Sequence, residues 1–195
     1  MQNEKLIELV AWIDEATKGL KLPGDRRARI ASACFDVAIE HQAAIALLSR
    51  AKLFGSVYAL LRVLFEAFVR GAWLFHCATD ADLDRFQKGK LKKKFNELIE
   101  EAETKVGAKD SALSSIHGKA WSAMNSFTHT GFMQVLRRNS EEKTGPNYDP
   151  NEITLVQKLA GVLGVFTAFE LAAVAGDDKL CRSVLEKHKT FLNAL

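Results

Sequence analysis

One nearly uninterrupted apolar run decides the fold: Ser56-Val-Tyr-Ala-Leu-Leu-Arg-Val-Leu-Phe-Glu-Ala-Phe-Val-Arg-Gly-Ala-Trp-Leu74. If this run is helical, apolar residues lie on nearly every side of the helix. A helix that is apolar all round belongs in the interior of a protein, because any exposed face would leave its side chains in water. The sequence therefore predicts a buried central helix over residues 56–77.

Apolar residues at three- and four-residue spacing continue on both sides of this run, which is typical of amphipathic helices. All three prolines lie between periodic segments, and no strand-like alternation is present. Helices are expected over residues 4–18, 25–52, 56–77, 80–86, 91–106, 111–127 and 150–176, and from residue 177 onward. Residues 131–150 form the least regular stretch. We predict an all-α fold, a single bundle of about seven helices forming one domain over residues 1–195.

Three helix starts carry recognisable caps. Asp25 follows Pro23 and Gly24 and is expected to cap the helix that begins there. Asp80 is expected to cap the short helix over residues 80–86. The Asp149-Pro150-Asn151-Glu152 stretch combines a cap, a proline in the first turn and a glutamate three residues after the cap.

The composition indicates a globular domain and argues against a disordered chain. Hydrophobic residues make up 48% and charged residues 26%, which is typical of a globular domain. The net charge of +3 permits an anionic partner without requiring one. The lysines of residues 88–94 precede an acidic stretch at 97–103, which indicates a solvated region with internal charge pairs.

The cysteines and histidines do not form a metal-binding pattern. The three cysteines, Cys34, Cys77 and Cys181, are far apart and surrounded by apolar residues. The sequence also lacks Glu-x-x-His, phosphate-binding and dinucleotide-binding motifs, so we expect no metal and no cofactor. Unpaired cysteines and the absence of a signal peptide favour the cytoplasm.

Residues 159–176 approach the length of a membrane span and carry a single charge, Glu170. Glycine and alanine recur in this segment every three or four residues, so that a neighbouring helix can approach closely. Because no flanking basic anchors accompany the segment, a buried helix is favoured over a membrane span, and no membrane contact is expected.

Tyr58, Arg62, Glu66 and Arg70 are each four residues apart, so they line one face of the central helix. Charges in apolar surroundings must pair or face a cleft, because desolvation is costly. One carboxylate between two guanidinium groups leaves an excess positive charge, which could anchor a phosphate or carboxylate. The alternative is an internal ion-pair ladder that fixes the helix register. Glu170 is expected to pair with Arg62 or Arg70.

The segment Asn125-Ser-Phe-Thr-His-Thr-Gly131 lies at the end of the 111–127 helix. Gly131 would allow a left-handed turn that aims His129 into a pocket. Gln134, Arg137 and Arg138 follow and would add hydrogen-bond donors to the same opening. The alternative is that His129 caps the last carbonyl groups of the helix.

Ten residues are thus candidates for the functional site. Four are assigned to an anchoring or catalytic role: Arg62, Glu66, Arg70 and His129. Six are assigned to ligand binding: Tyr58, Trp73, Asn125, Gln134, Arg137 and Arg138.

The string Leu-Leu-Arg-x-x-x-Glu-x-x-x-Arg-x-x-Trp, followed by Ser-Phe-Thr-His-Thr-Gly, resembles bacterial all-helical families of unknown function, which are distantly similar to HEPN-type bundles. This superfamily includes many metal-independent ribonucleases of toxin and phage-defence systems. Its nucleases carry Arg-x(4–6)-His, in which the arginine holds phosphate and the histidine performs acid–base chemistry on a ribose hydroxyl. Arg70 to His76 and Arg182 to His188 fit this spacing, whereas His129 has no arginine four to six residues before it.

Two hypotheses of function follow. The first is a non-catalytic module, a homodimer that binds an anionic ligand or a protein partner through the Arg/Glu/His pocket. The second is the activity that the resemblance implies: a HEPN-like ribonuclease or toxin acting on RNA and controlled by a neutralising protein partner. In the second, Arg62 and Arg70 bind phosphate, His129 is the general acid or base, and Glu66 orients an arginine.

Overall fold

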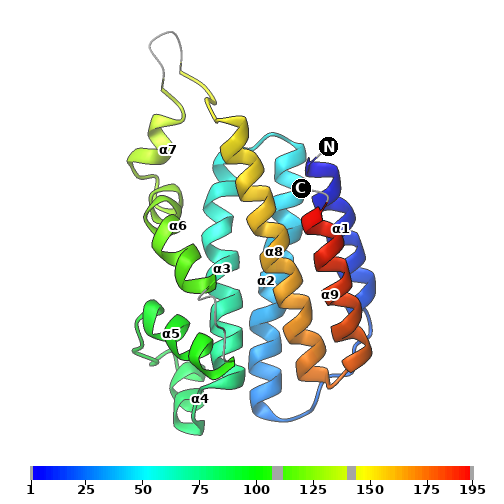
Figure 1. Cartoon of the computed structure of the whole chain (residues 1–195). Coiled ribbons are helices and arrows are strands. Elements are labelled where there is room, and N and C mark those ends of the chain that lie inside the picture. Colours follow the sequence, from blue (N-terminus) through cyan, green and yellow to red (C-terminus); the bar gives the residue numbers. More distant parts are fainter. Residues whose placement is uncertain (1, 107–111, 140–143, 194–195) are drawn as a thin grey trace.

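The computed structural model describes residues 2–106, 112–139 and 144–193, and within these ranges it contains nine α-helices and no strand (Figure 1). The helices are α1 (Gln2–Thr17), α2 (Arg26–Arg50), α3 (Phe54–His76), α4 (Asp80–Gln87), α5 (Phe95–Val106), α6 (Ala112–Thr128), α7 (Phe132–Leu136), α8 (Pro150–Ala175) and α9 (Asp178–Asn193). The all-α prediction is confirmed. The expected number of about seven was too low, chiefly because α7 forms within a stretch predicted to be irregular.

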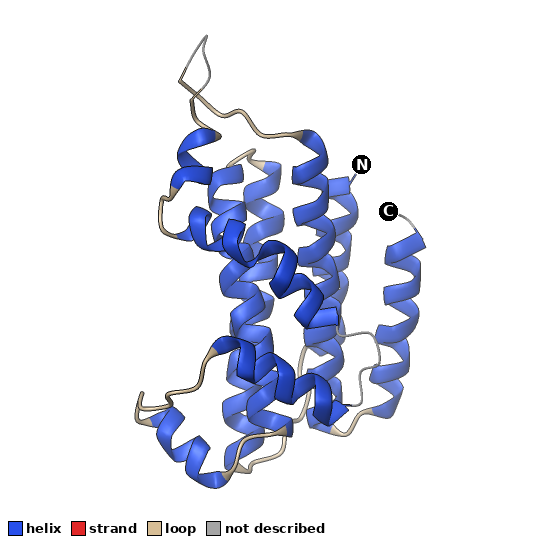
Figure 2. Ribbon diagram, turned by 60° about the vertical axis from the view of Figure 1, so that its left-hand side comes forward, coloured by secondary structure: helices blue, strands red, loops and turns tan. Residues whose placement is uncertain are grey.

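The central position of α3 is confirmed. This helix packs against α2, α5, α6 and α8, while α8 also packs against α1, α2 and α9. Figure 1 shows α4, α5, α6 and α7 gathered on one side of the long helices, and Figure 2 shows the same helices turned toward the viewer. Side chains from nearly every side of α3 are buried, including Leu64, Phe65 and Trp73. The central helix is therefore the element whose polar residues are most constrained by neighbours.

Small residues on α8 allow neighbouring side chains to approach its backbone. A Cβ atom added at Gly161 would lie 2.3 Å from the Phe191 ring of α9, and one at Gly164 would lie 1.9 Å from the Gln42 amide of α2. The spacing of these glycines thus provides close helix packing. By length and composition alone, both α2 and α8 could cross a membrane, but buried core helices satisfy the same criterion.

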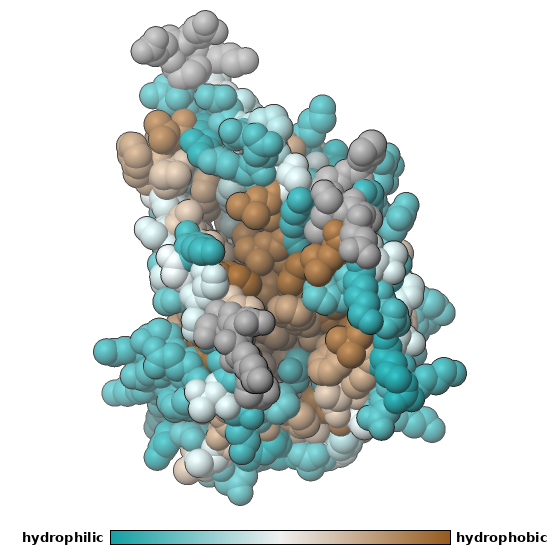
Figure 3. All heavy atoms as spheres, in the orientation of Figure 1, coloured by the Kyte–Doolittle hydropathy of each residue, from teal (hydrophilic) through white to brown (hydrophobic). Residues whose placement is uncertain are grey.

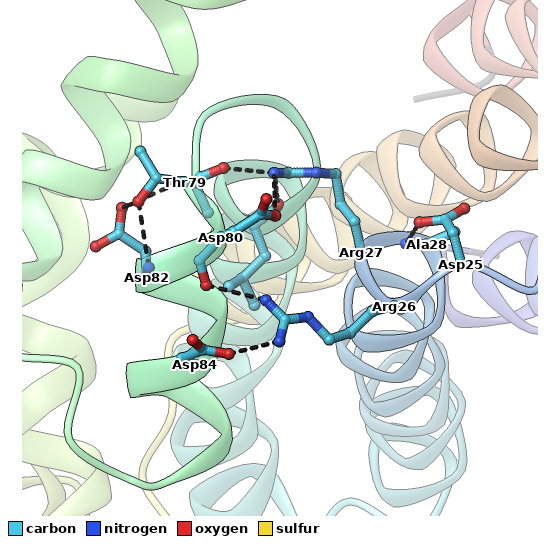
Figure 4. A network of polar contacts seen from close by, with 10 residues as sticks. Asp25, Arg26, Arg27, Ala28, Thr79, Asp80, Asp82 and Asp84 are labelled. Carbon is cyan, nitrogen blue, oxygen red and sulfur yellow. Dashed lines mark hydrogen bonds and ion pairs between the residues drawn. The ribbon is translucent and has the colours of Figure 1, made fainter.

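A network of arginines fixes α4 to the start of α2 (Figure 4). Arg26 Nη1 lies 2.5 Å from Asp84 Oδ1, and Arg27 Nη1 donates to the carbonyl oxygens of Leu74 and Ala78. The N-cap of α4 is Thr79, which forms a reciprocal capping box with Asp82, so the expectation that Asp80 caps this helix was wrong. The caps at Asp25 and Asp149 are confirmed.

The turn between α6 and α7 differs from the expected geometry. The left-handed residue is Thr130, with φ 52°, whereas Gly131 has φ −75° and needs no special freedom. A Cβ atom at Gly131 would, however, lie 2.7 Å from Ser126 Oγ. Glycine is therefore required here for close approach, because any side chain would collide with the last turn of α6.

Candidate functional site

The charged residues of α3 form a ladder around one carboxylate. Arg62 Nε donates to Glu66 Oε1 at 2.7 Å, and Arg70 Nη2 lies 3.8 Å from Glu66 Oε2. The exposed fractions of the three side chains are 20%, 26% and 38%, in chain order, so the ladder lies at the edge of the core. Two cations share one anion, which leaves one positive charge in excess, as the spacing predicted.

His129 joins this ladder from the turn that directly follows α6. Its Nε2 atom lies 2.7 Å from Arg62 Nη1, although the two residues are 67 positions apart in the sequence. A guanidinium group has five N–H donors and no acceptor, so Nε2 must accept in this contact. The proton of the neutral ring is then on Nδ1, and the exposed imidazole presents an N–H group away from Arg62.

Aromatic rings form the floor below Arg62. Its guanidinium carbon lies 5.0 Å from the centroid of the Trp121 ring, and Trp121 stacks on Phe95 of α5 at 4.7 Å. Stacking on indole orients a guanidinium group while leaving its edge free to donate. The Nη2 group of Arg62 makes no hydrogen bond with any residue that the structure describes.

Sequence reasoning did not identify Trp121, but the spacing contained the information. His117, Trp121 and Asn125 of α6 and His129 directly after it are each four residues apart, as are the members of the α3 ladder. The two helices place these faces against each other. Asn125 contributes a buried side-chain oxygen without a hydrogen-bond partner among the described residues.

The structure separates the other expected ligand-binding residues into a second group near the first turn of α3. The rings of Tyr58 and Tyr148 lie 5.5 Å apart, and the guanidinium of Arg138 lies 5.8 Å from the Tyr148 ring. A Cβ atom at Gly55 would lie 2.9 Å from Tyr148 Oη and 3.6 Å from Gln134 Nε2. The prediction of one opening shared by His129, Gln134 and Arg138 is not supported by any of these contacts.

Tyr58 and Arg137 differ in whether their polar atoms have a hydrogen-bond partner. Arg137 forms a bidentate ion pair with Glu152. Its charge is therefore neutralised, and its guanidinium group is not free to bind an anionic ligand. Tyr58 is buried, and its hydroxyl has no described hydrogen-bond partner. Burial, followed by the nearby Glu152 carboxylate, raises the pKa of Tyr58 far above its usual value. The phenol is therefore neutral and cannot act as an anion at ordinary pH.

Tyr58 also lines an apolar groove between α6 and α8, over α3. In Figure 3, apolar side chains are visible in the hollow between α6 and α8. Its lining includes Leu61, Met124 and Leu159. Of the charged residues in its lining, Arg137 is paired with Glu152, while Lys119 forms no ion pair with any residue that the structure describes.

Trp73 does not belong to the candidate site. The ring is buried, its Nε1–H donates to Glu101 Oε2 at 2.7 Å, and Lys93 Nζ lies 4.9 Å from its centroid. Trp73 follows Arg70 by three residues, but its contacts are with Glu101 of α5 and with Lys93, which precedes that helix.

Glu170 was expected to pair with Arg62 or Arg70. In the structure it pairs instead with His76. His76 Nε2 lies 2.8 Å from Glu170 Oε2, and the two side chains are 24% and 14% exposed. The two stretches with HEPN-like spacing are therefore not assembled as sites. His76 is bound to Glu170, and His188 packs edge-on against Phe166, where burial lowers its pKa.

Among the residues that the structure describes, no three His, Cys, Asp or Glu side chains are grouped so that they could hold a metal ion. The arrangement around Arg62 instead offers N–H groups. Guanidinium and imidazole donors beside an aromatic plane can bind an oxyanion without a metal.

A model of the Family of unknown function (DUF6988) matches residues 35–195, and the chain belongs to this family. The matched region includes α3, α6 and the Arg62–His129 contact. No curated protein and no solved structure matches the chain.

Proposed function

We propose that this protein binds an anionic ligand, with Arg62 and His129 as the primary donors. The observation that carries this proposal is the 2.7 Å contact between Arg62 Nη1 and His129 Nε2. It holds two nitrogen-rich side chains together without a shared anion between them. Arg62 Nη2 and His129 Nδ1 retain N–H groups, each of which can donate to an oxygen of a phosphate or carboxylate.

Glu66 and Trp121 have positioning roles in this proposal. Glu66 fixes the Nε side of Arg62, and Trp121 supports the guanidinium plane. Arg70 supplies the charge that Glu66 does not neutralise. The site therefore carries a net positive charge while His129 is neutral, which favours an anion over a cation or a neutral molecule.

Titration calorimetry with inorganic phosphate and with a tetra-uridylate tests this proposal. We expect Arg62→Gln and His129→Ala each to weaken binding by about tenfold, the effect of losing a charge-assisted hydrogen bond. Arg182→Gln is the matched control, since Arg182 is exposed on α9 and its removal changes the net charge equally. Equal affinity in the wild type and the Arg62 and His129 variants would refute the site.

A second candidate function is a metal-independent ribonuclease, favoured by the pairing of one guanidinium with one exposed imidazole. In this reaction Arg62 would hold the phosphate and His129, whose Nε2 accepts from Arg62, would use its Nδ1–H as the general acid that protonates the leaving 5′ oxygen, while water takes the proton of the ribose 2′-hydroxyl. The 2′ oxygen would attack phosphorus, and the bond to the 5′ oxygen would break as that oxygen receives a proton. The products would be a 2′,3′-cyclic phosphate and a 5′-hydroxyl.

Expression in a bacterial host separates the two candidates. If the protein is a ribonuclease, the wild type slows growth and degrades total RNA, and His129→Ala abolishes both effects. If it is a binding module, both forms are equally harmless. A toxic nuclease would also require a neutralising protein partner in its native host.

We further propose that the chain forms a cytoplasmic homodimer. Phe132, the first residue of α7, and Leu155, which lines the apolar groove, are 74% and 63% exposed, which is typical of a surface covered by a partner. Light scattering coupled to size exclusion is expected to give twice the mass of one chain. Phe132→Ser is expected to shift it to one, and a monomeric wild type would refute the proposal.

A further inference from the structure

A pocket of about 750 Å³ lies between α2, α3 and α4, on the side of the bundle where Glu66 and Arg70 emerge. Its walls are mostly apolar: Ile30, Ala33, Cys34 and Val37 of α2, Val63 and Ala67 of α3, and Phe86 of α4. Three arginines and one glutamate stand among them: Arg26, Arg29, Arg70 and Glu66. Pockets of about 300–1,000 Å³ with apolar walls and few polar groups are typical of small-molecule sites.

The charges of this pocket do not cancel. Arg26 is occupied by Asp84, and Glu66 is shared between Arg62 and Arg70. Arg29 is exposed and forms no ion pair or hydrogen bond with any residue that the structure describes. Two guanidinium groups, those of Arg29 and Arg70, are therefore available beside an apolar wall. Such groups bind carboxylate and phosphate oxygens in pairs.

The wall contributed by α4 is fixed in place. Arg26 bridges to Asp84 and to the carbonyl oxygen of Asp80, and Arg27 lies 3.7 Å from the Asp80 carboxylate (Figure 4). These contacts hold the start of α2 against α4, whose Phe86 and Gln87 close one side of the pocket. The cavity is thus formed before any ligand binds, which lowers the entropic cost of binding.

Cys34 contributes a neutral wall rather than a nucleophile. Burial raises the pKa of its thiol to about 11, although the positive charge of Arg70 acts in the opposite direction. A protonated thiol behaves as a small apolar group. The pocket is therefore suited to reversible binding, with an apolar interior and a cationic rim.

We propose that this pocket binds an amphipathic organic anion, with its aliphatic or aromatic body against α2 and α4 and its carboxylate or phosphate head on Arg29 and Arg70. This inference rests on the proposed anion-binding function because the two sites share Arg70 and Glu66. It extends that function by assigning the class of ligand, and it assigns a role to Arg29, which lies outside the Arg62–His129 contact.

Methyl NMR with matched eight-carbon probes tests the proposal. Octyl phosphate and octanoate carry the two alternative heads, 1-octanol lacks a charge, and inorganic phosphate lacks the apolar body. We expect octyl phosphate or octanoate to shift the methyl signals of Ile30, Val37 and Val63, while those of Leu155 and Val156 in the α6–α8 groove stay unchanged. The stronger of the two probes identifies the head group.

Two charge variants and one pair of matched variants locate the contacts. Arg29→Gln and Arg70→Gln are each expected to weaken binding of the anionic probe by about tenfold while leaving 1-octanol binding unchanged. At Val37, half-exposed in the wall, Val37→Glu is expected to weaken anion binding and Val37→Lys to retain it. Because this position is not in the core, both variants are expected to fold.

Two outcomes overturn the inference. One is that no probe shifts the pocket methyl groups, and the other is that the anionic probes bind Arg29→Gln as tightly as the wild type. His129→Ala separates this inference from the proposed function: it is expected to weaken inorganic phosphate binding at Arg62 by about tenfold but to leave octyl phosphate binding in the pocket unchanged. A wild type that binds octyl phosphate in the pocket but shows no effect of His129→Ala on inorganic phosphate would therefore refute the proposed function and leave this inference standing.

Discussion

Two histidines of this bundle contact side chains of opposite charge. His76 lies 2.8 Å from the Glu170 carboxylate, in a part-buried position between α3 and α8. His129 lies 2.7 Å from the Arg62 guanidinium, in an exposed position at the end of α6. The first pair joins a hydrogen-bond donor to an anion. The second joins two nitrogen groups that both favour an anion as a further partner.

The difference separates a structural contact from a candidate binding site. A carboxylate satisfies an imidazole N–H and is itself satisfied, so nothing more is needed at His76. A guanidinium consumes the only acceptor of His129 and leaves donors on both residues. The surplus of donors, rather than the presence of a histidine, is therefore what indicates a ligand at Arg62 and His129.

The largest stability effect is expected from breaking the structural pair. His76→Ala leaves the largely buried Glu170 carboxylate without its partner and is expected to lower the free energy of unfolding by about 2 kcal/mol. Urea denaturation measures this. In the double variant with Glu170→Ala, the two losses should not add, because the second substitution removes the unpaired group. Additive losses would mean that the pair is not coupled.

Two tryptophans sharpen the same comparison. Trp73→Phe removes the Nε1–H that donates to Glu101 and is expected to cost about 1 kcal/mol of stability, with anion affinity unchanged. Trp121→Phe keeps a ring under Arg62 and is expected to cost less stability but to weaken phosphate binding. Urea denaturation and titration calorimetry on both variants check this. If Trp73→Phe weakened phosphate binding and Trp121→Phe did not, Trp73 rather than Trp121 would belong to the binding site.

The pH dependence of protein stability is expected to distinguish Glu101 from an ordinary exposed carboxylate. Hydrogen bonds from Lys93 and Trp73 lower the pKa of Glu101, so the charged form stabilises the fold above the unfolded-state pKa. This contribution is lost as pH falls through the lower, folded-state pKa. Compared with Glu101→Gln, the wild type should be more stable near pH 7, and the gap should close in the acidic range. A gap that is independent of pH would contradict this assignment.

The smallest stability effect is expected at His129. Because its side chain is exposed, His129→Ala should change the free energy of unfolding by less than about 0.5 kcal/mol. Thermal denaturation of this variant beside His76→Ala makes the comparison direct. If both variants were destabilised equally, the two histidines would have the same structural role.

Most of the fold could be predicted from the sequence because it depends on periodicity. The apolar run of α3, the caps at Asp25 and Asp149 and the small residues of α8 are local patterns with direct physical consequences. The short α7 was missed because five residues give too little periodicity to recognise.

The site could be predicted only in part. Spacing placed Arg62, Glu66 and Arg70 on one face, but it could not give the rotation of that face relative to α6 and α8. Side chains at positions four apart turn gradually around a helix, so Tyr58 reaches the α6–α8 groove while Arg70 reaches the α2–α4 pocket. The partner of Glu170 was misassigned for the same reason, since pairing across helices depends on how they pack.

Nitrogen-15 NMR of the histidine side chains during titration with inorganic phosphate tests the central claim most directly. His129 is predicted to carry its proton on Nδ1 and to shift with phosphate in the wild type but not in Arg62→Gln, while His76 serves as an unresponsive internal reference. A His129 signal that ignores phosphate, or one that responds equally without Arg62, would contradict the site.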